Sequence, residues 1–314
     1  MESFSEEYIH VNGISEYLLH YFSKPEDPLI LHIHGGPGAP ASVFAYVVEA
    51  FSRNYNIVYY DQRGAGKTLL KNPFAKVSME ALQQDLLETV LCLKQKYRKE
   101  KLIILGHSWG SVLGSVFVLD HPEHVQAYIG TGQMYCFSEN ERMGYEFLRE
   151  AVRRYQDEKA AKALKRIGRY PAENCSFRAL LDNSRVRALQ GKFGLAMTMD
   201  KKALKILRDS PITGPADLPA FLLGGLRSAP VMKNFWNADL RDKGYTYQAP
   251  VYYLMGDRDR TTPYEIAREY FEKIRAPYKK WQFVPDAGHF AMLDNTNAWR
   301  QAINGIIKDL QNLY

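Results

Sequence analysis

The fold is decided by Lys101-Leu-Ile-Ile-Leu-Gly106-His-Ser108-Trp-Gly110-Ser-Val-Leu-Gly114. Its first five residues are an apolar run typical of a buried parallel strand, and residues 111–119 favour a helix. Between them stands the pattern G-x-S-x-G, for which a strand-to-helix turn is the expected context. Only glycine fits beside the serine in so tight a turn. We therefore predict Ser108 to be a nucleophile at the carboxyl edge of a sheet, where the helix N-terminus favours negative charge.

Strand and helix patterns alternate on both sides of this stretch. Residues 7–11 and 16–21 predict a hairpin around Asn12-Gly13. Further apolar runs predict parallel strands at residues 28–34, 56–60, 126–130, 250–255 and 281–284. Helical spacing predicts helices at residues 78–97, 263–274 and 297–313, the first of them capped by Ser78. Alternation of this kind indicates an α/β fold, with a mostly parallel sheet covered on both faces.

Residues 134–245 interrupt the alternation. They contain amphipathic helical segments but no strand-like run, and their length far exceeds an ordinary connection. We predict an inserted helical cap over residues 134–245, with a core formed by residues 1–133 and 246–314. The helical segments lie at residues 139–155, 160–167, 176–188 and 200–208.

The basic charge of the chain is concentrated in the cap. The whole sequence has a net charge of +6, and residues 134–243 contain 21 Lys and Arg against 13 Asp and Glu. This excess indicates either solvated helix faces or attraction of an anionic substrate or surface.

A serine hydroxyl needs a base, and the base needs a carboxylate that orients it. Among eight histidines, His289 alone follows the last predicted strand, on a loop that contains Gly288. The other histidines lie in the hairpin, in or just after an early strand, beside the nucleophile or after its helix: His10, His20, His32, His34, His107, His121 and His124. For the acid we favour Asp259, with Asp257 as the alternative. Both follow the preceding strand, in the order Ser, Asp, His that α/β-hydrolases use.

A tetrahedral intermediate needs backbone N–H donors aimed at its oxyanion. The amide of Trp109, directly after the nucleophile, is one expected donor. The second is expected from His34-Gly-Gly36-Pro-Gly38 at the end of an early strand, with Gly36 favoured over Gly35.

Other classes of function find little support. Gly64-Ala-Gly66-Lys-Thr68 resembles a phosphate-binding loop, but residues 56–61 offer no glycine where that pattern requires its first. No metal-ligand spacing is present, so we expect no cofactor. Groove-reading elements for nucleic acid and an apolar run long enough to span a membrane are absent from the sequence. Three scattered cysteines and an acidic start without a signal pattern favour a cytoplasmic setting. The sequence carries no signal for the oligomeric state.

With these motifs in order, the chain resembles the proline iminopeptidase family of α/β-hydrolases. The resemblance is carried by His34-Gly-Gly-Pro-Gly38, Asp61-Gln-Arg-Gly-Ala-Gly66 and Gly106-His-Ser-Trp-Gly-Ser111, followed by Gly256-Asp-Arg-Asp259 and Gly288-His289. It covers the core, residues 1–133 and 246–314. It implies Ser108, Asp259 and His289 as the triad, and release of an N-terminal residue, often proline, from short peptides.

The cap departs from the family pattern. Family members that cleave N-terminal proline place cap carboxylates against the substrate's ammonium group, often in a Trp-Glu context, but none of the four tryptophans here precedes Glu. Glu139, Glu141 and Glu146 are the candidates for this role, and the alternative is that they are solvated helix residues.

Three functions therefore compete. The first is a serine aminopeptidase that acts on N-terminal proline or another small residue. The second is an amidase or esterase with a different acyl substrate, and the third is a binding protein on a hydrolase scaffold. Epoxide hydrolysis is disfavoured because its alkyl-enzyme chemistry needs a carboxylate at the position of Ser108.

Overall fold

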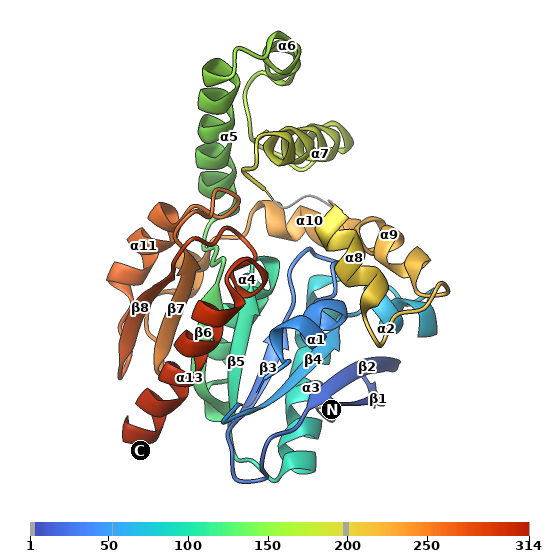
Figure 1. The fold of residues 1–314 in the computed structure, drawn as a ribbon, viewed down its shortest axis with the longest axis vertical. Coiled ribbons are helices and arrows are strands. Elements are labelled where there is room, and N and C mark those ends of the chain that lie inside the picture. Colours follow the sequence, from blue (N-terminus) through green and yellow to red (C-terminus); the bar gives the residue numbers. More distant parts are fainter. Residues whose placement is uncertain (1–3, 52, 197–200, 314) are drawn as a thin grey trace.

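The computed structural model describes residues 4–51, 53–196 and 201–313 (Figure 1). Within them, eight strands form one sheet in the order β1-β2-β4-β3-β5-β6-β7-β8. The strands are β1 (Phe4–Val11), β2 (Ile14–Tyr21), β3 (Leu29–Ile33), β4 (Asn56–Asp61), β5 (Leu102–His107), β6 (Val125–Thr131), β7 (Val251–Gly256) and β8 (Lys279–Val284). The pairs β1–β2 and β2–β4 are antiparallel, and every pair from β4 to β8 is parallel. Each predicted strand is present, with ends shifted by up to three residues.

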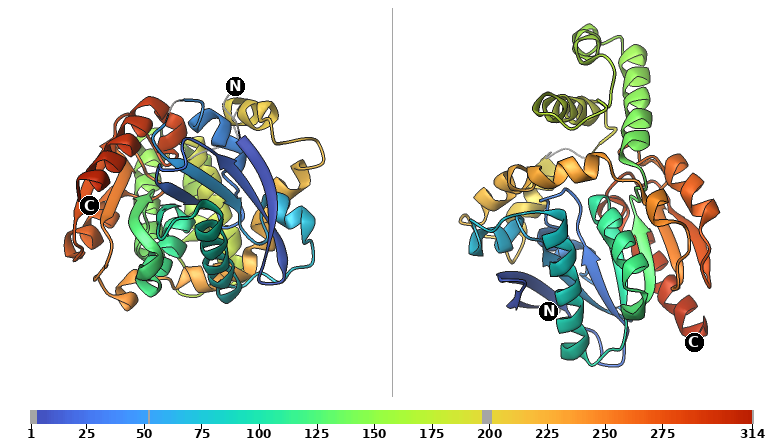
Figure 2. Two further views of the ribbon diagram at one scale, coloured as in Figure 1. Left: turned by 90° about the horizontal axis from the view of Figure 1, so that it is seen from below. Right: turned by 180° about the vertical axis from the view of Figure 1, so that it is seen from behind.

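Helices cover both faces of the sheet, as predicted (Figure 2). On one face, α3 (Met79–Tyr97), α4 (Trp109–Asp120) and α11 (Tyr264–Lys273) bury their apolar stripes in one core cluster. On the other face, α1 (Ala45–Val48), α12 (Ala291–Asp294) and α13 (Thr296–Leu313) share a second cluster. The side chain of Ser78 accepts a hydrogen bond from the amide of Ala81, which confirms the predicted cap of α3. The short helices α1, α12 and α2 (Gly66–Lys71) were not predicted, because four to six residues hold too little periodicity.

Residues 134–245, which we call the cap segment, form helices between β6 and β7. These are α5 (Phe137–Arg154), α6 (Glu158–Ile167), α7 (Phe177–Lys192), α8 (Lys201–Asp209), α9 (Leu218–Arg227) and α10 (Ala229–Trp236). Figure 1 shows α5, α6 and α7 projecting away from the sheet, while α8, α9 and α10 lie across its carboxyl edge. The first four match the predicted helical segments, although residue 200 lies outside the described residues.

Two helices of the cap segment were missed in the sequence. Both α9 and α10 carry a proline in their first turn, where the missing N–H is tolerated. The same prolines, together with Gly224 and Gly225 inside α9, read as loop signals in the sequence. Across the part of the chain that the structure describes, no helix is long and apolar enough to cross a membrane.

The turn between β5 and α4 has the tight geometry predicted for a nucleophile. Ser108 has φ 55° and ψ −122°, a conformation that L residues rarely adopt. A Cβ on Gly106 would lie 2.6 Å from the carbonyl oxygen of Gly110. A Cβ on Gly110 would lie 2.1 Å from the carbonyl oxygen of Ile33 in β3. The neighbouring backbone atoms cannot move aside, so neither position has room for a Cβ and both require glycine.

Gly110→Ala should destabilise the fold by about 3 kcal/mol, because the new methyl group overpacks against β3. Gly305→Ala is the matched control, since a Cβ at Gly305 meets nothing within 4 Å and the residue lies inside α13. This control should gain about 0.5–1 kcal/mol from helix propensity. Urea unfolding of both variants measures the two effects, and equal stabilities would contradict the packing account.

Candidate active site

Ser108, His289 and Asp259 form one hydrogen-bonded row at the carboxyl edge of the sheet. The distance from His289 Nε2 to Ser108 Oγ is 2.9 Å, and that from His289 Nδ1 to Asp259 Oδ2 is also 2.9 Å. Ser108 follows β5, Asp259 follows β7 and His289 follows β8. Ser108 and His289 are 181 positions apart along the chain, yet their side chains lie within hydrogen-bonding distance.

Asp259 is held as an ionised acceptor. Its side chain is fully buried and accepts hydrogen bonds from the amides of Thr261 and Thr262 at 2.9 Å and from Thr262 Oγ1 at 2.6 Å. Burial alone would raise its pKa, but the adjacent His289 and the hydrogen bonds lower the pKa below the usual value. The carboxylate can therefore stabilise an imidazolium at His289.

Asp257, the alternative acid, has a different partner. Its Oδ1 accepts a hydrogen bond from the amide of Ala287 at 3.1 Å, and the amide of Arg258 donates to the carbonyl of Ala287 at 2.8 Å. Asp257 thus joins the loop after β7 to the loop that carries His289.

His107 contacts the base, which the sequence did not predict. Its ring lies 4.8 Å from the ring of His289. Its Nε2 is 2.9 Å from the carbonyl oxygen of His289. Burial, and then the nearby His289, lower the pKa of His107 to about 3. The neutral ring therefore donates this hydrogen bond and fixes the backbone of the base loop.

Gly132 provides the space for the imidazole. It follows β6 with φ +48°, and a Cβ there would lie 2.9 Å from Cε1 of His289. A glycine directly after a parallel strand was the only sequence signal for this role.

The loop after β3 approaches the nucleophile closely, as the sequence predicted. A Cβ on Gly35 would lie 3.1 Å from Cβ of Ser108, and Gly36 has φ +118°. Gln62 fastens this loop, because its Nε2 donates to the carbonyl of His34 at 2.8 Å and its Oε1 accepts from the indole of Trp109 at 3.0 Å. The roles of the Gly36 and Trp109 amides as oxyanion donors stay predictions.

Asp61 fastens the loop that follows β4. It accepts from Ser42 Oγ at 2.6 Å and from the amide of Lys67 at 2.8 Å.

The three glutamates of α5 have different surroundings. Glu146 pairs with Arg149 on the surface, as a solvated residue would. Glu139 accepts from the hydroxyl of Tyr135 and pairs with Arg241 at 2.8 Å. Glu141 is buried, so the alternative prediction that it is a solvated helix residue is wrong. Its carboxylate binds the polar side chains of Tyr170, Asn183 and Arg187.

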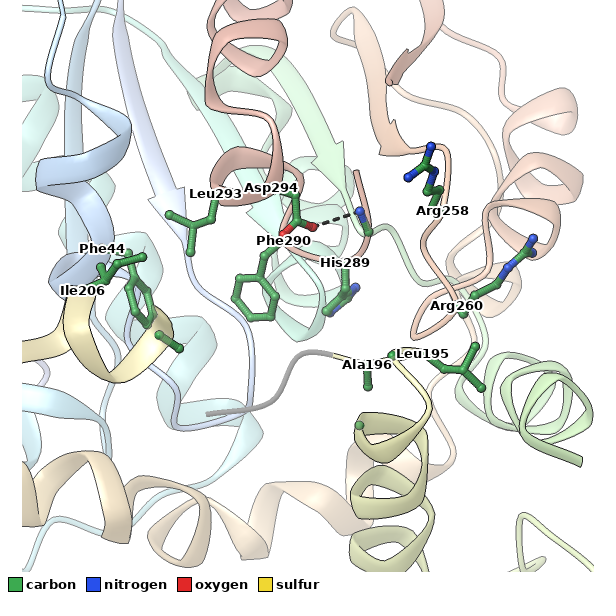
Figure 3. Close-up of a pocket in the computed structure, with 14 residues that line it drawn as sticks. Phe44, Leu195, Ala196, Ile206, Arg258, Arg260, His289, Phe290, Leu293 and Asp294 are labelled. Carbon is green, nitrogen blue, oxygen red and sulfur yellow. Dashed lines mark hydrogen bonds between the residues drawn. The ribbon is translucent and has the colours of Figure 1, made fainter. Parts of the chain in front are cut away.

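A cavity of about 530 Å³ lies against Ser108, His107, His289 and the loop after β3. Its wall is mostly apolar and includes Phe44, Met134, Phe137, Leu207, Met232 and Phe235. A second hollow of about 390 Å³ adjoins it and shares Phe44, Ala196, His289, Phe290 and Leu293 (Figure 3). There Asp294 accepts a hydrogen bond from the amide of Gly288 at 2.9 Å, which anchors the base loop. His289 thus lines both spaces.

This fold and site define an alpha/beta hydrolase. The family model for the alpha/beta hydrolase fold matches residues 28–296, so the chain belongs to that family.

The relatives named in sequence comparison include aminopeptidases. Probable aminopeptidase YbaC of Bacillus subtilis (strain 168) is 24% identical over 293 residues, which cover 89% of this chain and 88% of that protein. The proline iminopeptidase of Neisseria gonorrhoeae is 28% identical over 136 residues, 43% of this chain and 42% of that protein. The predicted resemblance to proline iminopeptidases is thereby confirmed.

Solved structures agree in fold. The proline iminopeptidase of Mycobacterium smegmatis has a TM-score of 0.70 at 16% identity, with 98% of each chain covered. Epoxide Hydrolase A from Mycobacterium thermoresistibile has a TM-score of 0.58 at 22% identity, again with 98% of each chain covered. At these identities the likeness concerns the fold alone.

Gly132→Ala should lower kcat about 100-fold, because the methyl group displaces the imidazole of His289 from Ser108. Gly13→Ala is the control: Gly13 also has positive φ (+75°), but a Cβ there meets nothing within 4 Å. The control should lose a little stability and keep its kcat. Equal kcat values in the two variants would contradict the claim that a side chain at residue 132 displaces the imidazole.

His107→Gln should change how stability depends on pH. Unfolded histidine titrates near pH 6.5, whereas folded His107 has its pKa lowered to about 3 by burial. The folded state keeps its full stability above pH 6.5. As the pH falls below 6.5, the unfolded state takes up the proton first and stability is lost.

The loss due to His107 is about 2 kcal/mol between pH 8 and pH 5. Urea unfolding at both pH values should therefore show that the variant loses about 2 kcal/mol less than the wild type. A difference between the two proteins that is independent of pH would refute this account.

Proposed function

We propose that this protein is a serine hydrolase that cleaves an amide or ester bond through an acyl-enzyme on Ser108. The observation that carries the proposal is the row of hydrogen bonds from Ser108 through His289 to a buried Asp259. His289 takes the proton of Ser108 as the hydroxyl attacks the scissile carbonyl. It then returns the proton to the leaving group, and water releases the acyl group by the same route.

We assign the backbone amides of Trp109 and Gly36 as the hydrogen-bond donors to the oxyanion of the intermediate. Trp109 is the first residue of α4, where the helix N-terminus adds favourable potential. The close approach of the loop after β3 to Ser108 supports the second donor. A hydroxyl at the turn, in place of a carboxylate, argues against the alkyl-enzyme chemistry of an epoxide hydrolase.

The first candidate substrate is a short peptide from which an N-terminal proline or other small residue is released. The aminopeptidase and proline iminopeptidase names of the relatives support it. The second hollow beside His289 supports it further, because a leaving group of peptide size has room there.

The second candidate is an amide or ester of a different acyl group. It is favoured by the mostly apolar cavity and by Glu141, the buried cap carboxylate, whose charge is already compensated by Arg187. An isolated cap carboxylate would serve an ammonium group better.

Ser108→Ala should lower kcat at least about 1,000-fold while the fold is kept, because the nucleophile is lost and the loops that hold it are not. A fluorophosphonate probe should label the wild type at Ser108 and leave the variant unlabelled, as seen by mass spectrometry. Labelling of the variant to the same extent would refute the assignment of the nucleophile.

Prolyl-β-naphthylamide and p-nitrophenyl esters distinguish the two substrate classes. Release of naphthylamine supports the aminopeptidase. Cleavage of esters together with inertness toward every aminoacyl amide supports the second candidate.

A further inference from the structure

Two polar side chains of α7 line the mostly apolar cavity beside Ser108. Asn183 and Arg187 are one helical turn apart, so both face the same side of α7. Figure 1 shows α7 in the part of the cap segment that stands away from the sheet. The two side chains therefore reach the cavity from the cap segment.

A buried carboxylate fixes the orientation of both side chains. Glu141 is fully buried and takes an ion pair from Arg187 and hydrogen bonds from Tyr170 Oη and Asn183 Nδ2, the last at 3.0 Å. Because a carboxylate only accepts, the amide nitrogen of Asn183 must face it. The carbonyl oxygen Oδ1 of Asn183 is then the atom turned away from Glu141.

The positive partner of the ion pair is the one nearer the cavity. The side chain of Arg187 is 30% exposed, whereas that of Glu141 is 0% exposed and does not line the cavity. Arg187 Nη1 also donates to Gln190 Oε1 at 2.7 Å, which holds the guanidinium in place. The cavity wall thus presents a cationic donor, with its counter-charge behind it.

This arrangement discriminates between substrate groups by their charge. A carbonyl or carboxylate oxygen can accept from the guanidinium in a water-poor site, where such hydrogen bonds are strong. An ammonium group would lose hydration and meet a like charge. The cavity volume lies in the range of sites that hold drug-sized ligands, so an acyl group can extend from Ser108 toward α7.

We propose that Arg187, which Glu141 orients together with Asn183, binds the far end of the acyl group, and that this end carries a carbonyl or carboxylate oxygen. The inference rests on the proposed acylation of Ser108. A prolyl group has no such oxygen, so this inference favours the second candidate substrate, an amide or ester of a different acyl group.

Four p-nitrophenyl esters of similar length test the subsite: pentanoyl, 4-oxopentanoyl, 4-carboxybutanoyl and, as the amino ester, 5-(trimethylammonio)pentanoyl, whose quaternary nitrogen cannot close to a lactam. We expect kcat/KM to be roughly tenfold higher for the oxo or the carboxy ester than for the pentanoyl ester. The amino ester should be the poorest substrate. Comparison of the oxo and carboxy esters shows whether the subsite prefers a neutral carbonyl oxygen or an anionic carboxylate oxygen.

Arg187→Met should abolish the advantage of the oxygen-bearing esters over the pentanoyl ester. Since this change leaves Glu141 buried without its cation, the double variant Glu141→Gln/Arg187→Met provides a neutral pair of similar size. Arg185→Met is the matched control, because Arg185 lies on α7 but its side chain is 61% exposed and paired with Asp182. The control should keep the wild-type preference.

The outcomes separate this inference from the proposed function. If the amino ester is the best substrate, or if the double variant lowers all four esters equally, the subsite is refuted while the serine hydrolase stands. If the esters are inert and Ser108 fails to react with fluorophosphonate, the proposed function itself is refuted.

Discussion

The close contact between Gly110 and β3 is the constraint on which the site depends. The backbone of α4 can press against the carbonyl of Ile33 only because residue 110 has no Cβ. This contact sets the entry angle of α4, and so the unusual backbone conformation of Ser108. The same contact brings the loop after β3 beside the nucleophile. The absence of one methyl group therefore positions both the proposed nucleophile, Ser108, and a proposed oxyanion donor.

The parallel sheet provides the rest of the site through the common direction of its strands. β5, β6, β7 and β8 end at one edge, so the loops that follow them meet there. Each loop contributes one element: the hydroxyl of Ser108, the space at Gly132, the carboxylate of Asp259 and the imidazole of His289. Strong local restraints hold these loops, such as the three hydrogen bonds that Asp259 receives from Thr261 and Thr262.

The sequence predicted the sheet and the row of three residues because these depend on short-range signals. Apolar runs mark buried strands, and polar residues directly after them mark the carboxyl edge. The contacts of His107 and Gly132 with His289 were missed, because each joins residues more than 150 positions apart and has no local pattern. The burial of Glu141 was missed for a related reason. Glu141 lies on the buried face of α5 with Phe137 and Leu148, but an ionisable residue is usually exposed, and the carboxylate is enclosed by contacts with Tyr170 and α7, which are distant in the sequence.

The joined loops after β7 and β8 have a mechanical consequence. The amide of Arg258 and the side chain of Asp257 both bind Ala287, so the two loops behave as a single body at the open edge of the sheet. Ser108 lies in the middle of the sheet, and the hydrogen bond from the neighbouring His107 to the carbonyl of His289 joins its turn to these loops. A shift of the edge would carry the carboxylate and the imidazole together and leave their mutual bond unbroken. The hydrogen bond from His107 to the carbonyl of His289 therefore limits how far the imidazole can move from the hydroxyl of Ser108 when the edge shifts.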